Sequence, residues 1–128
     1  VFSPLAGGIL TGKYNDGIPE GSRGSQYGSG WLSDNFADDR ISKARQLTAL
    51  AQEYGYELSA LALAWAMHHP GVDSVITGAT KPSHVESNLK ALDVTLSSDL
   101  EKKIEDILEN RPYNSRRAVM TADEHLAI

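Results

Sequence analysis

The sequence predicts an α/β fold, in which strands alternate with helices along the chain. Two short apolar runs, at residues 1–3 and 72–77, are of the type that forms strands, and the second is rich in β-branched residues. Apolar residues recur at helical spacing between and after these runs. This alternation indicates a parallel sheet or barrel. Because a (β/α)8 barrel needs eight strands in about 250 residues, we expect the missing strands to precede Val1, unless the fold is a smaller one.

The composition is that of an ordinary globular domain, with 41% hydrophobic and 23% charged residues among 128. The net charge of −5 argues against a general nucleic-acid binder, which would carry a basic patch. The absence of cysteine excludes disulfides and thiolate metal sites and agrees with a cytoplasmic protein. No apolar run reaches the roughly 20 residues of a membrane-spanning helix, so we expect no membrane insertion.

The chain begins inside a strand-like run without an initiator methionine, so we expect a longer N-terminal part to precede it. Pro4 should end this first strand, because proline lacks a backbone donor. The next stretch of about thirty residues has eight glycines between positions 7 and 30 and few periodic apolar positions. It predicts a long loop, and loops of this length in compact domains are usually functional or disordered.

A helix should follow this loop. We expect it to start near Asp38 and to end at Gly55, a residue suited to the left-handed position after a helix. Leu47, Leu50 and Tyr54 are spaced to share one helix face.

The next helix is predicted at residues 60–69, with Ser59 as its N-terminal cap and Pro70 after its end. This segment is apolar nearly all round. A helix of that kind is normally buried.

Residues 72–77 form the second predicted strand, and residues 78–81 form the turn after it. Pro82 suits the first position of a following helix, which we expect to extend to about residue 92. A strand, a glycine turn and a helix start form an anion site, because the first helical amides lack partners. Thr80 adds a hydroxyl and Lys81 a positive charge. An ordinary helix start without a ligand is the alternative.

Ser98 and Glu101 have the spacing of a capping box ahead of the last helix. The apolar face of that helix would consist of Leu100, Ile104, Ile107 and Leu108. From Asn110 onward the chain is polar. We therefore predict one domain over residues 1–113 and a polar C-terminal tail over residues 114–128.

The first glycine-rich segment matches the start of a P-loop, from Gly7 to Lys13, but a P-loop then needs Ser or Thr to hold magnesium. Tyr14 stands at that position, so we disfavour a nucleoside triphosphatase. A different interpretation is a strand-end loop at residues 3–8 whose backbone amides approach a pyrophosphate. Lys13 and Arg23 would then supply positive charge. A glycine-rich surface loop with solvated cations is the alternative.

His84 and Asn88 are spaced i, i+4 in the predicted helix after Pro82, so both could contact a ligand at its start. A polar outer face is the alternative. His68 and His69 are adjacent and would point about 100° apart on a helix, which is unsuited to chelating one metal ion. We predict no metal site.

Two separated segments, in the same order and spacing, resemble the aldo-keto reductase family. Residues 1–14 are similar to the segment at and after the seventh barrel strand of that family. Residues 74–80, running into 86–92, are similar to the eighth strand and its helix. Further residues resemble the subgroup that contains potassium-channel β-subunits: Gly17-Ile18-Pro19, Ser22-Arg23, Trp31-Leu32 and Asn110-Arg111-Pro112-Tyr113.

The resemblance implies the C-terminal part of a (β/α)8 TIM barrel: the last two strands, their helices and a C-terminal helix. It also implies bound NADPH. Phe2 would stack on the nicotinamide, and residues 3–7 would lie along the pyrophosphate and ribose. Cofactor-binding positions of the family fall on Phe2, Ser3, Pro4, Leu5, Ala6, Gly7, Lys13, Arg23, Gly78, Thr80, His84, Ser87 and Asn88.

By the same resemblance, Lys13 and Arg23 would clamp phosphates. Gly78, Thr80 and His84 would surround the 2′-phosphate, and residues 87–88 would face the adenine. Two positions depart from the family pattern. Ser replaces a usual Glu at 87, and His replaces a usual Gln or Arg at 84.

The family transfers a hydride from NADPH to an aldehyde or ketone, with a Tyr acid assisted by Lys, Asp and His. These four residues lie upstream in the family and have no counterpart here, so we assign no catalytic residue. The expected function is the cofactor-binding part of an NADPH-dependent oxidoreductase acting on a small carbonyl substrate. The alternatives are a channel β-subunit-like regulatory protein that binds NADPH and a catalytically inert fragment. A homo-oligomer or a channel is the expected protein partner.

Overall fold

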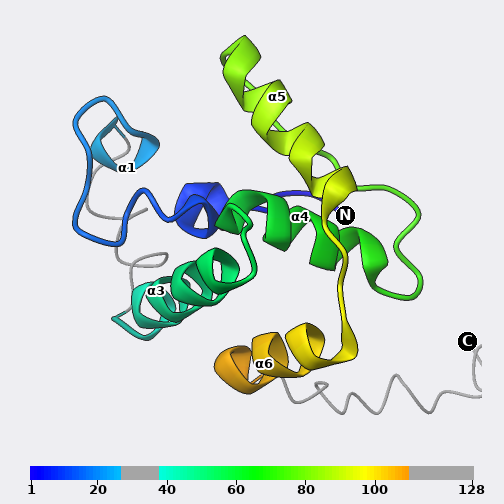
Figure 1. Cartoon of the computed structure of the whole chain (residues 1–128). Helices are drawn as coiled ribbons and strands as arrows, with labels where there is room; N and C mark the ends of the chain where they lie inside the picture. Colours follow the sequence, from blue (N-terminus) through cyan, green and yellow to red (C-terminus); the bar gives the residue numbers. More distant parts are fainter. Residues whose placement is uncertain (27–37, 110–128) are drawn as a thin grey trace, which may run out of the picture.

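The computed structural model describes residues 1–26 and 38–109. The residues Trp31-Leu32 and Asn110-Arg111-Pro112-Tyr113 and the predicted tail lie outside these ranges. Helix α4 lies at the centre, in contact with the elements before and after it (Figure 1). In chain order the elements are the 3-10 helix η1 (Ala6–Thr11), α1 (Arg23–Gln26), α3 (Asp38–Glu53), α4 (Leu58–His68), α5 (Pro82–Leu89), the 3-10 helix η2 (Lys90–Asp93) and α6 (Ser98–Leu108).

The two predicted strands lie side by side and parallel, but they are much shorter than expected. Within the described ranges, pairing is limited to one isolated bridge between Phe2 and Ile76. The Ile76 amide donates to the Val1 carbonyl at 2.9 Å, and the Val1 amino group donates to the Ser74 carbonyl at 2.8 Å. The prediction of strands over residues 1–3 and 72–77 is therefore wrong in extent, because only one residue of each segment is paired. A parallel ladder is normally covered on both faces, whereas the side chains of Phe2 and Ile76 are 80% and 66% exposed.

The predicted long loop contains two short helical segments, η1 and α1. It folds around Tyr14, whose side chain is only 2% exposed. The buried Tyr14 hydroxyl accepts a hydrogen bond of 3.0 Å from the Gly24 amide in α1. Gly7 and Gly8 turn the chain with φ values of 67° and 105°, a region that glycine enters without steric cost. A contact between positions ten residues apart thus gives order that local periodicity does not indicate.

The main core forms where α3, α4 and α6 meet, as the periodic apolar positions predicted. The N-terminal half of α4 is buried, which confirms the expectation for this apolar helix. Buried residues of α3 and α6 pack against this half of α4. Among the described helices none has the length and apolarity needed to cross a membrane. The buried cluster comprises Leu47, Leu50, Ala51, Leu58, Leu61, Leu100 and Ile104.

Helix boundaries follow the sequence signals closely, but two caps differ. Gly55 has φ 77° directly after α3, and Pro82 stands in the first turn of α5, as predicted. The N-cap of α4 is Glu57 rather than Ser59, and its side chain makes no capping hydrogen bond. The N-cap of α6 is Ser97, one residue before the predicted cap, and its hydroxyl accepts from the Leu100 amide at 3.2 Å. The helix expected to reach residue 92 changes to the 3-10 helix η2 at residue 90.

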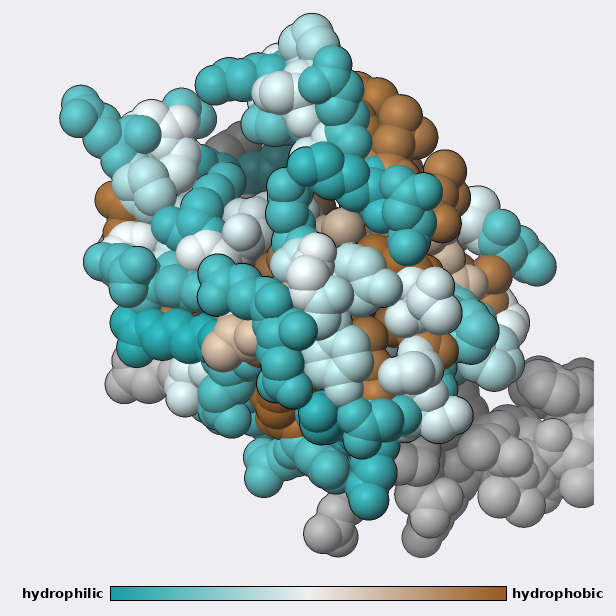
Figure 2. All heavy atoms as spheres, in the orientation of Figure 1, coloured by the Kyte–Doolittle hydropathy of each residue, from teal (hydrophilic) through white to brown (hydrophobic). Residues whose placement is uncertain are grey.

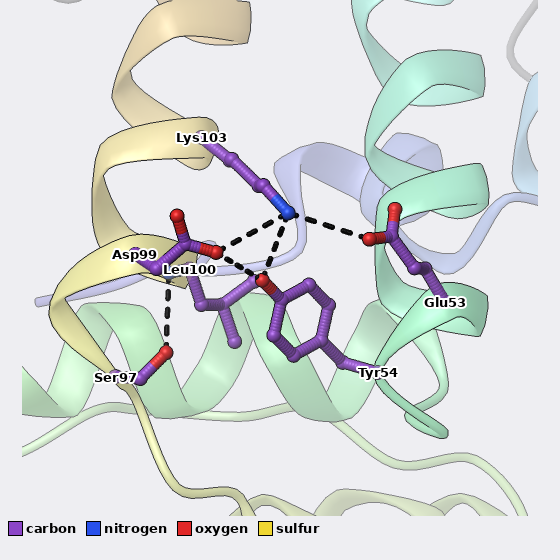
Figure 3. Close-up of polar contacts among 6 residues, drawn as sticks. All are labelled: Glu53, Tyr54, Ser97, Asp99, Leu100 and Lys103. Carbon is purple, nitrogen blue, oxygen red and sulfur yellow. Dashed lines mark hydrogen bonds and ion pairs between the residues drawn. The ribbon is translucent and has the colours of Figure 1, made fainter.

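A polar cluster joins the end of α3 to the start of α6 (Figure 3). The Tyr54 hydroxyl donates to Asp99 at 2.5 Å and accepts from the Lys103 ammonium at 3.0 Å. Lys103 also lies 3.2 Å from Asp99 and 3.3 Å from Glu53. The hydrogen bond from Tyr54, followed by that from Lys103, lowers the pKa of Asp99 below its ordinary value.

We expect this cluster to make stability depend on acid pH. Because the folded-state pKa of Asp99 lies below 3.8, its contribution is fully present above the unfolded value and is lost as pH falls through the folded value. Asp99→Asn should therefore lower the urea midpoint near neutral pH. The difference from the parent chain should shrink below about pH 4. Urea unfolding between pH 3 and 7 tests this.

The matched control is Asp106→Asn, which removes an exposed carboxylate from the same helix. Its effect should be small near neutral pH, because exposed charges without such contacts contribute little. A midpoint difference for Asp99→Asn that is equally large at pH 3 and pH 7 would contradict the assignment.

Candidate functional site

The two segments predicted to form the site emerge next to each other. The Phe2–Ile76 bridge fixes them in parallel, so the chain leaves both segments in the same direction. Just beyond and beside the bridge, Leu5 and Val75 pack against a common buried cluster that contains Leu63 and Ala64 of α4. In parallel α/β folds, ligands bind beyond the carboxyl ends of the strands. The loop after residue 3 and the turn after residue 77 lie at such ends.

The first loop has an unusual backbone. Ser3 and Ala6 have φ values of 53° and 48°, a region that non-glycine residues seldom adopt. Such strain is concentrated at functional sites in proteins. However, the Ala6 and Gly8 amides donate to the Ser3 and Leu5 carbonyls, each at 2.9 Å. Those two amides are thus engaged within the loop. The strand-end interpretation had instead expected them to point toward an anion.

Lys13 folds back over this loop. Its ammonium lies 4.9 Å from the centre of the Tyr14 ring, and 2.9 Å from where a Cβ would stand on Gly8. A side chain at position 8 would therefore displace the ammonium. Tyr14 itself is a core residue whose hydroxyl accepts from Gly24, so its place does not fit the magnesium-binding position of a P-loop. Arg23 is exposed on α1, which that same hydrogen bond attaches to Tyr14.

The second turn brings Thr80 and His84 together at the start of α5. The Thr80 amide and hydroxyl both lie 3.5 Å from Nδ1 of His84, a long and weak contact. Both residues are exposed, as is Gly78, where an added Cβ would meet no atom within 4 Å. The space over this turn is therefore open to a ligand.

One turn further along α5, Ser87 and Asn88 are half-buried. The Ser87 hydroxyl donates to Oε2 of Glu57 at 2.9 Å, and Lys90 donates to Oε1 of the same carboxylate at 2.6 Å. Both hydrogen bonds lower the pKa of Glu57, and the one from Lys90 has the larger effect. Glu57 was not among the residues that the sequence indicated. The weak signal was a glutamate directly before a helix, where Ser, Thr, Asp or Asn is usual.

Comparison with known proteins shows the family of this chain. Residues 1–109 match the model of the Aldo/keto reductase family. The chain belongs to the aldo-keto reductase family. The fold of this family is a (β/α)8 barrel.

Proteins named as a voltage-gated potassium channel subunit beta are similar to this aldo-keto reductase chain. One from Schizosaccharomyces pombe is 43% identical over 117 residues, which cover 88% of the chain and 34% of the relative. Those of Arabidopsis thaliana and Oryza sativa are also 43% identical, over 115 residues that cover 87% of the chain and 35% of each relative. The chain thus spans about a third of the length of these curated relatives.

One cavity in the described part of the aldo-keto reductase chain is not at the predicted polar residues. It has a volume of about 370 Å³ and an almost wholly apolar lining. Phe2 and Pro4 contribute to it, but the other predicted site residues do not. The remaining wall comes mainly from α4 and α6. A phosphorylated ligand does not suit such an apolar lining, so this cavity is not a phosphate site.

The chain also exposes apolar side chains on one flank of α5. Figure 2 shows hydrophobic surface beside this helix, at the upper right. Val85, Leu89 and Leu92, spaced i, i+4 and i+7, are exposed there. Phe2 and Ile76 are exposed at the bridge. Contiguous apolar surface of this kind marks a place where other protein segments pack.

Proposed function

We propose that this chain supplies the cofactor-binding C-terminal part of an NADPH-dependent oxidoreductase that reduces aldehydes or ketones to alcohols. The observation that carries the proposal is the parallel Phe2–Ile76 bridge, from which the first loop and the second turn emerge side by side. Family membership supports it, since aldo-keto reductases in general use a nicotinamide dinucleotide. In this proposal the chain corresponds to the last two strands of the barrel, their helices and the C-terminal helix.

The charges and open spaces of the two segments fit a phosphorylated dinucleotide. In the first loop, Lys13 and Arg23 would neutralise the pyrophosphate, beside Ser3 and the small residues Ala6 and Gly7. Pro4 and Leu5 would shape the same wall, and Phe2 would stack on the nicotinamide ring. In the second turn, Gly78, Thr80 and His84 would receive the 2′-phosphate, while Ser87 and Asn88 would face the adenine.

Bound NADPH would supply the hydride that reduces the carbonyl carbon. The part of this chain would be to bind and orient the cofactor, so that its nicotinamide is held against Phe2. Binding the cofactor in a fixed orientation lowers the activation barrier, because the translational and rotational entropy of the reactants is already lost before the reaction step. The acid that protonates the carbonyl oxygen would come from residues outside this chain.

A second candidate is a regulatory NADPH-binding protein that associates with a membrane channel. It is favoured by the names of the relatives, each a voltage-gated potassium channel subunit beta. In that case the same residues would bind the cofactor, and turnover would be absent or slow. Both candidates are consistent with a cytoplasmic protein that forms homo-oligomers. A catalytically inert fragment is the third alternative.

Titration and turnover with the full-length protein distinguish the candidates. We expect NADPH to bind with micromolar or tighter affinity and to be oxidised on addition of aromatic or aliphatic aldehydes. Binding without turnover, together with co-purification of a channel, would favour the regulatory candidate. Failure of NADPH to bind would overturn both of the cofactor-based proposals.

A further inference from the structure

Glu57 is the N-cap residue directly before α4, but its carboxylate makes no hydrogen bond with that helix. It makes no capping hydrogen bond with the α4 amides, although carboxylates at N-caps commonly do so. Instead it reaches α5, where Ser87 and Lys90 donate to its two oxygens. These partners lie 30 and 33 residues away in the chain. The carboxylate is therefore positioned by tertiary contacts beside the turn of α5 that carries Ser87 and Asn88.

The carboxylate retains capacity to accept further hydrogen bonds. Each of its oxygens has about two acceptor positions, and each receives one donor from the described residues. Its side chain is 51% exposed, so a ligand can reach it. Glu57 is ionised near neutral pH, since the hydrogen bonds from Lys90 and Ser87 only lower its pKa further, and an ionised carboxylate accepts hydrogen bonds but cannot donate them. The site thus favours a group that brings N–H donors.

Asn88 adds the complementary groups. It follows Ser87 directly and is half-buried, and its side-chain amide makes no hydrogen bond within the described part of the chain. Its amide offers both a donor and an acceptor. The edge of adenine that bears the amino group presents N–H donors beside a ring nitrogen acceptor, a pattern that an amide can pair with in a bidentate way. A carboxylate next to such an amide strengthens the preference for an amino group.

We propose that Glu57 is a specificity-determining residue that selects adenine by accepting a hydrogen bond from its amino group, with Ser87 holding the carboxylate in place. This inference rests on the proposed NADPH site and extends it to a residue on a different helix. A purine with a carbonyl oxygen in place of the amino group would bring its lone pairs against the carboxylate. Unpaired acceptors facing each other disfavour binding, and this repulsion gives specificity.

Binding of NADPH and of its hypoxanthine analogue, in which a carbonyl replaces the adenine amino group, tests the proposal. With the full-length protein we expect NADPH to bind at least about tenfold more tightly, which corresponds to loss of one charge-assisted hydrogen bond. In Glu57→Gln the ratio should fall to about threefold or less, because a glutamine amide rotates to offer either a donor or an acceptor.

Two control variants separate this effect from a general loss of charge. Lys90→Gln breaks the same ion pair but keeps the carboxylate, so it should leave NADPH preferred over the analogue. Glu53→Gln removes an exposed, ion-paired carboxylate at the end of α3 and should leave the ratio unchanged. Ser87→Ala should lower the ratio without changing charge, since the carboxylate loses a positioning donor.

The outcomes are distinguishable. If the parent protein binds NADPH and Glu57→Gln retains the full preference over the analogue, the role of Glu57 is overturned while the cofactor site stands. The role of Glu57 would also be overturned if Lys90→Gln lost the preference for NADPH as completely as Glu57→Gln. The ion pair, and not the carboxylate as acceptor, would then determine the preference. If neither cofactor binds the parent protein, the proposed function fails, and this inference fails with it.

Discussion

Replacing Leu100 with alanine is expected to lower the free energy of unfolding by about 2–5 kcal/mol. Leu100 is 0% exposed in the cluster where α3, α4 and α6 meet. Truncation removes buried methyl groups and leaves a cavity, and the two effects add. Because small domains are stable by only about 5–15 kcal/mol, this variant should unfold at a much lower urea concentration. Equilibrium unfolding followed by circular dichroism measures the change.

Leu92→Ala is the matched control, since it makes the same truncation at a side chain that is 72% exposed in η2. We expect a change within about 0.5 kcal/mol for the 128-residue chain. A cost equal to that of Leu100→Ala would show that another segment or a second copy covers Leu92. A negligible cost for Leu100→Ala would mean that the three helices do not pack as described.

The helices could be predicted because their signals are local. The periodic apolar positions of α3 and α6 point to the shared core. Gly55 follows the end of α3, and Pro82 begins α5. Caps were less predictable. Ser97 and Ser98 are both acceptable N-caps by residue type, and geometry selects Ser97, whose hydroxyl meets the Leu100 amide.

The strands and the loop were less predictable because their partners are distant in sequence. A β-branched run becomes a strand only when neighbours complete its hydrogen bonds, and the described residues give Phe2 and Ile76 a single bridge. The ordered turns of the loop depend on Tyr14 and on its contact with Gly24. Glycine content alone indicates irregular structure and says nothing of such an anchor.

The candidate site was predictable where a short sequence interval holds the residues. Thr80 and His84 are four residues apart and lie together at the start of α5. Glu57 could not be found in this way, because its contacts with Ser87 and Lys90 join two helices. The roles of all these residues toward a cofactor stay predictions until binding is measured.

Replacing Lys13 with methionine is expected to weaken NADPH binding by the full-length protein by roughly tenfold to a hundredfold, the range of one charge-assisted hydrogen bond. Methionine preserves most of the apolar stem and removes the ammonium, which lies over the Tyr14 ring and close to Gly8. Arg23→Ala should have an effect of similar size. Fluorescence titration with NADPH and with NADH measures both variants.

Comparing the affinities for NADPH and NADH shows which phosphate each cationic side chain contacts. If Lys13 and Arg23 contact the pyrophosphate, which NADPH and NADH share, both affinities should fall by the same factor. His84→Ala should instead weaken NADPH selectively, because His84 lies with Thr80 at the turn proposed for the 2′-phosphate. Lys102→Ala removes the same charge from α6 and should change neither affinity by more than about twofold. Unchanged affinity in Lys13→Met would show that the first loop is not part of the phosphate site. The proposal that this loop and the turn before α5 bind one dinucleotide would then fail.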